Sequence, residues 1–181
     1  MINRNGFYKK TRRGKVVRLI HEKYLRTDVG CGYVGGIQLS EDRLRGMVSE
    51  SPHQQCLIID TNIALHQIDL LEYKCPAIST VIVLQTVLQE LRHLNISCFH
   101  RMQSLLKDEH RSFVFYPNEL SAETSTQRTQ DELVNDFNDR AIRKSAKYFN
   151  DLLAGVGKTI LISNDKNNRV SKDNTFRVLF K

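Results

Sequence analysis

The chain has 181 residues, of which 40% are hydrophobic and 26% are charged, so it is long enough to bury one core of its own. Its apolar runs are far shorter than the ~20 residues that span a bilayer, and its start lacks the apolar segment of a signal peptide. We therefore expect an intracellular protein with no membrane partner. The four cysteines are widely spaced, which favours free thiols over a zinc site.

The net charge of +7 is concentrated at the N-terminus. Residues 1–26 hold nine Lys and Arg residues and one Glu, whereas the rest of the chain holds 18 basic and 19 acidic residues. Such a block favours a polyanion or an acidic protein surface as partner, because neutralising phosphates releases counterions. The alternative is a solvated basic tail.

The first third of the chain shows weak structural signals. Residues 14–20 are compatible with a short strand. Residues 27–55 contain four glycines within seven positions and a Ser-Pro pair, which predicts an irregular linker. We expect a basic N-terminal extension and Gly-rich linker over 1–55 and the folded domain over 56–181.

The domain is predicted to begin with a buried strand. Cys56–Ile59 is an unbroken apolar run that stops at Asp60, as in strands covered on both faces. A helical pattern then starts near Ile63, with Thr61 or Asn62 as its cap, and ends before residue 76. Asp60 would stand at the carboxyl end of the strand, where α/β sheets bind ligands. The alternative is a cap or turn residue.

Strands and helices alternate through the rest of the domain. Further helices are predicted over 85–94, 99–107 and 138–155, a polar loop over 117–135, and strands over 81–84, 112–116, 159–163 and 176–180. This order predicts an α/β fold, a doubly wound parallel sheet of four to five strands with helices on both faces. No Gly-rich phosphate loop precedes a helix, so we expect no nucleotide cofactor.

Four acids are predicted to meet at one edge of this sheet. Asp60 and Asp165 follow strands, Glu90 lies in the helix after the second strand, and Asp139 lies early in the long helix. Carboxylates brought together repel one another unless cations intervene, and Mg²⁺ and Mn²⁺ prefer such oxygen ligands. These ions promote hydrolysis of phosphodiesters. The alternatives are a surface position for Glu90, a pair between Asp139 and Arg143, and a turn role for Asp165.

These motifs resemble a known family. Asp60-Thr-Asn62, the block Val81–Glu90, Asn138-Asp139 and Ser163-Asn-Asp165 are similar to PIN domains. The closer resemblance is to the N-terminal PIN domain of the catalytic ribonuclease subunit of the eukaryotic RNA exosome, in the segments 11–26 and 60–72. The resemblance implies a PIN-like nuclease domain over 56–181.

The resemblance also implies an activity. It implies an endoribonuclease that hydrolyses phosphodiester bonds in single-stranded RNA with one or two Mn²⁺ or Mg²⁺ ions. The catalytic and metal-binding residues would be Asp60, Glu90, Asp139 and Asp165. The residues expected to contact RNA, which flank these acids in the sequence, are Asn62, Arg140, Lys166 and Arg169. The implied setting is the exosome core, in rRNA processing and RNA decay, in the nucleus, nucleolus and cytoplasm.

Two departures from the family matter. The family usually carries a cysteine cluster after the Tyr-Leu-Arg segment, where this chain has Cys31 alone. The RNA-binding barrels and exonuclease domain that follow in the family are absent from the 181 residues, so we expect a fragment, short isoform or reduced paralogue without processive exonuclease activity. The alternative function is a catalytically weak module that docks onto the exosome core. A phosphoacceptor receiver domain is disfavoured, because it needs paired acids after the first strand.

Overall fold

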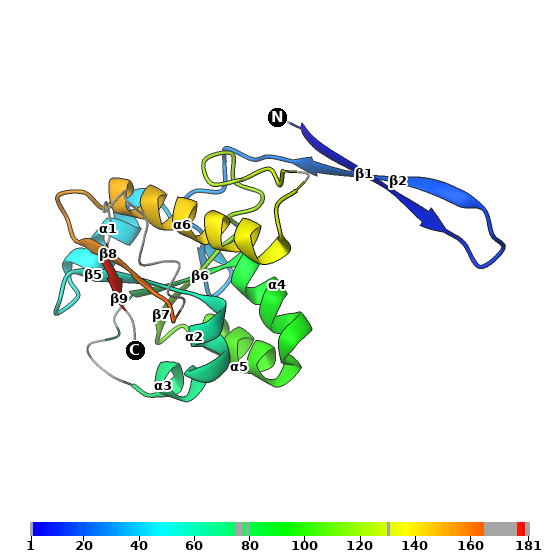
Figure 1. Cartoon of the computed structure of the whole chain (residues 1–181). Coiled ribbons are helices and arrows are strands. Elements are labelled where there is room, and N and C mark those ends of the chain that lie inside the picture. The colour runs from blue at the N-terminus through cyan, green and yellow to red at the C-terminus, as the bar shows by residue number, and fades with distance from the viewer. Residues whose placement is uncertain (1, 75–77, 79, 130, 165–176, 180–181) are drawn as a thin grey trace.

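The computed structural model describes the chain except for residues 1, 75–77, 79, 130, 165–176 and 180–181 (Figure 1). In this part of the chain the main sheet has seven strands in the order β4-β3-β7-β6-β5-β8-β9. Their bounds are β3 Tyr33–Val34, β4 Ile37–Gln38, β5 Gln55–Ile59, β6 Thr80–Leu84, β7 Ser112–Tyr116, β8 Lys158–Ile162 and β9 Arg177–Leu179.

The five strands β7, β6, β5, β8 and β9, in this order across the sheet, pair with one another in parallel. The β3–β4 hairpin pairs with the outer side of β7 in the antiparallel sense. Five parallel strands confirm the upper end of the predicted range. The helices are α1 Glu41–Ser49, α2 Thr61–His66, α3 Ile68–Glu72, α4 Gln85–Leu94, α5 Ile96–Lys107 and α6 Val134–Leu152. Figure 1 shows α1 and α6 over one face of the sheet and α2 to α5 over the other, as predicted.

The central strands form the core. All five residues of β6 and four of the five in β5 are buried, because helices cover both faces of these strands. The predicted bounds of α4 and β7 agree with the structure residue for residue, whereas α5 and α6 begin earlier than predicted. No helix among the described residues is long and apolar enough to cross a membrane.

The expectation of an irregular segment over 27–55 is wrong for much of its length. It contains α1, which Ser40 caps by accepting a hydrogen bond from the backbone N–H of Arg43 at 3.3 Å. Leu44 and Val48 of this helix are fully buried, and Val29, Cys31 and Leu39 also belong to the core. This segment therefore packs as part of the fold. The domain boundary at residue 56 stays a prediction.

The basic extension forms an antiparallel hairpin of β1 Ile2–Lys10 and β2 Val16–Tyr24. The predicted strand over 14–20 covers part of β2, and β1 was missed. Figure 1 shows this hairpin projecting from the body of the molecule. Its end is tied to the body at Arg26, which exchanges backbone hydrogen bonds with Leu120 and Ala122. Two-stranded hairpins are marginally stable when isolated.

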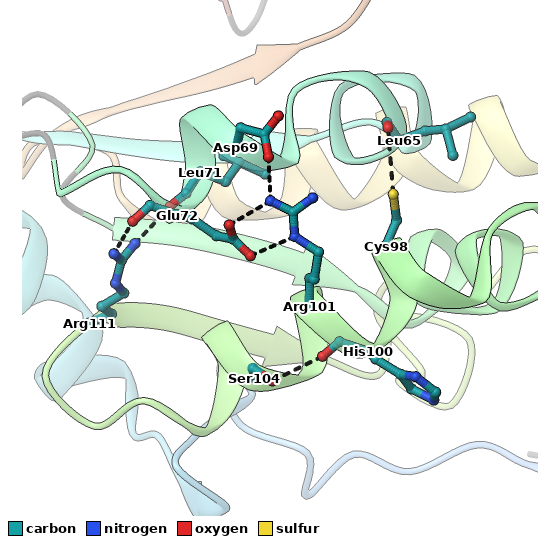
Figure 2. A network of polar contacts seen from close by, with 9 residues as sticks. All are labelled: Leu65, Asp69, Leu71, Glu72, Cys98, His100, Arg101, Ser104 and Arg111. Atoms are coloured by element: carbon teal, nitrogen blue, oxygen red, sulfur yellow. Dashed lines mark hydrogen bonds and ion pairs between the residues drawn. The ribbon is translucent and has the colours of Figure 1, made fainter.

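A network of polar contacts holds α2, α3 and α5 together (Figure 2). Arg101 of α5 binds both carboxylate oxygens of Glu72, with 2.8 Å from Nε to Oε1, and also contacts Asp69 of α3. Arg111 donates to the carbonyls of α3, and the Cys98 thiol lies 3.6 Å from the Leu65 carbonyl of α2. These contacts fix α2 and α3 against α5, and α2 begins at the carboxyl end of β5.

Candidate active site

A pocket of about 640 Å³ lies at the carboxyl ends of the central strands, between α2, α4 and α6. Asp60, Glu90 and Asp139, three of the four predicted acids, line it together with the predicted RNA contact Asn62. Parallel strands present their carboxyl ends at one edge of the sheet, which is why residues far apart in sequence meet there. The assignment of a function to these four residues stays a prediction.

Asp60 is 3% exposed and is held on both carboxylate oxygens. It is the N-cap of α2, where Oδ1 accepts a hydrogen bond from the backbone N–H of Thr61 at 2.6 Å. The Ser163 hydroxyl, beyond the end of β8, donates to Oδ2 at 2.7 Å. The structure thus agrees with the capping alternative and also places this carboxylate in the pocket. A cap fixes the side-chain rotamer, so the two roles are compatible.

Glu90 is half-buried, and two hydrogen bonds orient it. The Thr61 hydroxyl of α2 donates to Oε2, and the Asn138 amide of α6 donates to Oε1 at 2.7 Å. The alternative of an ordinary surface position is therefore wrong. Because α2, α4 and α6 all contribute to this contact, the Glu90 carboxylate is a junction between three helices.

Asp139 and Arg140 follow Asn138 in α6 and have different surroundings. Asp139 is half-buried and lines the pocket. Arg140 does not line it, and instead binds both oxygens of Glu132 at 2.8 and 2.7 Å and the Gln127 carbonyl at 2.9 Å. The bond to Arg140 lowers the pKa of Glu132. A contact between Arg140 and RNA stays a prediction, and Asp165, Lys166 and Arg169 lie outside the described residues.

The carboxylates that line the pocket are the right type of ligand for a hard divalent cation, because Mg²⁺ and Mn²⁺ prefer carboxylate oxygens. Among the described residues, no group of three or more His, Cys, Asp and Glu side chains is arranged to hold an ion. Of the four predicted acids, Asp60, Glu90 and Asp139 line the pocket, and Asp165 lies outside the described residues.

Sequence reasoning missed several residues of the pocket. Glu119 lines it as a further carboxylate, three residues beyond β7. The rule that an acid beyond a strand end marks the site would have found it. Asn118 orients the first turn of α4, accepting from the Thr86 N–H at 3.2 Å and donating to the Thr86 hydroxyl at 2.9 Å. The hydrogen bonds from Thr61 and Asn138 to Glu90 join helices that are far apart in the sequence, so no local sequence pattern indicates them.

The fold and the acidic pocket define a class of protein, and comparison with known proteins agrees. Residues 57–174 match the family model described as PIN domain. The chain belongs to the PIN domain family, which confirms the predicted fold class and resemblance. The structure of the T. brucei RRP44 PIN domain superposes with a TM-score of 0.69 over 86% of this chain and 88% of that one, at 24% identity. At this identity the likeness shows the fold.

Three of the similar curated relatives have the name RRP44 or are named as its homologue. The chain is 40% identical to the exosome complex exonuclease RRP44 of Mus musculus, over 93% of this chain and 19% of that protein. It is 39% identical to the protein of the same name from Homo sapiens, with the same coverage. The homolog A from Arabidopsis thaliana is 36% identical over 93% of this chain and 17% of its own length. The chain thus spans about a fifth of the length of the curated relatives that it matches.

Proposed function

We propose that this chain is a divalent-metal-dependent endoribonuclease that hydrolyses phosphodiester bonds in single-stranded RNA. The main support for the proposal is that Asp60, Glu90 and Asp139 line one pocket in a chain of the PIN domain family. A cluster of carboxylates repels a polyanion such as RNA, so binding RNA here requires a cation to offset their charge.

The residues have distinct parts in the proposed reaction. Asp60, Glu90 and Asp139, together with Asp165, would hold one or two Mn²⁺ or Mg²⁺ ions. When bound, such an ion lowers the pKa of a water and stabilises the charge that develops on the phosphodiester. Asn62 is exposed at the pocket, where its amide is available to an RNA oxygen.

The setting is a further part of the proposal. The curated relatives are named as exosome components, so we propose that this chain associates with the exosome core and acts in RNA processing and decay, in the nucleus and cytoplasm. The basic block in residues 1–26 supports an anionic partner.

A circular single-stranded RNA tests the activity, because a circle has no ends for an exonuclease. The purified chain should open the circle with Mn²⁺ and leave it intact when EDTA replaces the ion. An intact circle in Mn²⁺, with folding verified by circular dichroism, would refute the proposal. Cutting that persists in EDTA would refute its dependence on metal.

The second candidate function is a docking module that cuts RNA poorly. The projecting hairpin favours it, because Tyr8 (72% exposed), Val16 and Tyr24 are large apolar side chains open to solvent. Binding of the purified exosome core by the full chain, lost on deletion of residues 1–24, would support docking. If this binding occurs without metal-dependent cleavage, docking replaces the enzyme proposal.

A further inference from the structure

The pocket has an apolar side that the acids do not explain. Leu94 at the end of α4 and Val134 at the start of α6 line it while 64% and 53% exposed. Phe137, half-buried, lines the pocket beside them. Apolar side chains left open inside a concave site are typical of ligand contacts. We call Leu94, Val134 and Phe137 the apolar shelf.

The spacing of residues along α4 and α6 places the apolar shelf next to the acids. Leu94 follows Glu90 by four residues on α4, and Val134 precedes Asn138 by four residues on α6. Residues four apart lie on the same face of a helix, about one turn or ~5.4 Å away. Glu90 and Asn138 are joined by their 2.7 Å hydrogen bond. Both helices therefore present a polar group at this contact and an apolar group one turn away.

Phe137 gives the shelf an aromatic surface beside the acid that would bind metal. It stands two residues before Asp139 in the first turns of α6, and both line the pocket. The guanidinium carbon of Arg140, which is paired with Glu132, lies 5.6 Å from the centre of the Phe137 ring. Arg128 is the arginine that lines the pocket itself. An aromatic ring with a cation in the same pocket suits a nucleotide, whose base stacks while its phosphate is neutralised.

We infer that the apolar shelf holds an unstacked nucleobase of the RNA while the adjacent phosphate faces Glu90 and Asp139. This inference rests on the proposed function, since it names what part of the substrate the same pocket takes. Bases in a duplex are stacked and paired, so a base can reach the shelf only from a single strand. The shelf thereby makes the pocket selective for single-stranded RNA.

The test separates base contacts from phosphate contacts. Binding is measured by fluorescence anisotropy in Mn²⁺, in the Asp139→Asn background, before appreciable cleavage. The probes are a short labelled oligouridylate and a sugar–phosphate strand of equal length without bases. Phe137→Ala is compared with Phe137→Tyr, which keeps the ring, and with Leu133→Ala, which removes a 68% exposed side chain that does not line the pocket.

Phe137→Ala should weaken oligouridylate binding by roughly 5- to 160-fold, the usual range for losing one base–aromatic stack, and leave binding of the base-free strand unchanged. Phe137→Tyr and Leu133→Ala should bind both probes like the parent. Equal losses on both probes, no loss on either, or an equal loss in Leu133→Ala would overturn the shelf. A denaturing gel of the same samples tests the proposed function separately. Cleavage of the RNA by the Asp139→Asn protein would refute the assignment of the acids and would leave the apolar shelf untouched.

Discussion

Gly32→Ala tests whether the segment before α1 is part of the fold. Gly32 has φ +108°, and a Cβ built on it would lie 2.4 Å from the backbone oxygen of Phe115 and 3.0 Å from a methyl carbon of Val114. The Phe115 oxygen belongs to β7 and cannot move without disturbing the sheet. Backbone strain of about 1–3 kcal/mol and overpacking of about 1–3 kcal/mol together predict a loss of about 2–6 kcal/mol in the free energy of unfolding.

Two other glycines are matched controls for this substitution. Gly36 has φ +85° with open space around its Cβ position, so Gly36→Ala should cost only the backbone term of about 1–2 kcal/mol. Gly46 lies inside α1, also with open space, and Gly46→Ala should stabilise the protein by about 0.5–1 kcal/mol.

The assay is thermal or urea unfolding followed by circular dichroism. A loss of that size in a chain of this length corresponds to a fall in Tm of roughly 4–24 °C for Gly32→Ala. If Gly32→Ala were no less stable than Gly36→Ala, the close approach of this segment to β7 would be wrong.

Three further predictions concern the site, the helices and the hairpin. Asn138→Ala should leave the fold intact but raise the Mn²⁺ concentration needed for half-maximal cleavage by about tenfold, because it frees one oxygen of Glu90; an unchanged Mn²⁺ dependence would contradict this. The bond to Arg101 lowers the pKa of Glu72, so its contribution to stability is present above the ordinary glutamate pKa of about 4.3 and is lost as the pH falls through the lower folded-state value. Arg101→Met should therefore unfold more easily than the wild type at pH 7 but equally easily at strongly acidic pH, and a difference that persists in acid would refute the pairing. Deleting residues 1–24 should flatten the dependence of RNA affinity on salt, since it removes eight of the 27 basic residues; an unchanged slope would assign the hairpin to a protein partner.

The elements that sequence predicted well carry strong local signals. Residues 81–84 are an unbroken apolar run, and the helical spacing that follows defines α4 to the residue. The place of Asp60 at the pocket was predictable because a residue directly after a parallel strand lies at the sheet edge where α/β folds bind ligands, and the same residue also caps α2. The meeting of Asp60, Glu90 and Asp139 then follows from parallel topology, which the alternation of strands and helices indicates.

The missed elements depend on contacts across the fold. The glycines of residues 30–36 suggest a linker, yet the residues between and after them form the β3–β4 hairpin on the edge of β7. The polar helix α1 is held by packing and by a 2.6 Å hydrogen bond from Arg45 to the Leu152 carbonyl at the end of α6. A local sequence pattern cannot indicate contacts such as these, because the contacting residues are far apart in the sequence.

The start of α6 was also missed, for a reason that bears on function. Its predicted start at residue 138 rested on the stripe of buried residues, which begins at Ala141. Val134 and Phe137 precede that stripe and line the pocket instead of the core. A core-based pattern therefore omits the residues that the apolar shelf uses.

Cleavage of a circular single-stranded RNA in Mn²⁺ by Asp139→Asn and Asp136→Asn is the most direct test of the central claim, that the pocket acids carry out hydrolysis. Both substitutions remove one carboxylate from the first turns of α6, but Asp136 is exposed and does not line the pocket. The wild type and Asp136→Asn should open the circle at similar rates, and Asp139→Asn should be slower by at least about 100-fold. Near-wild-type cleavage by Asp139→Asn, or equal losses in both variants, would contradict the account.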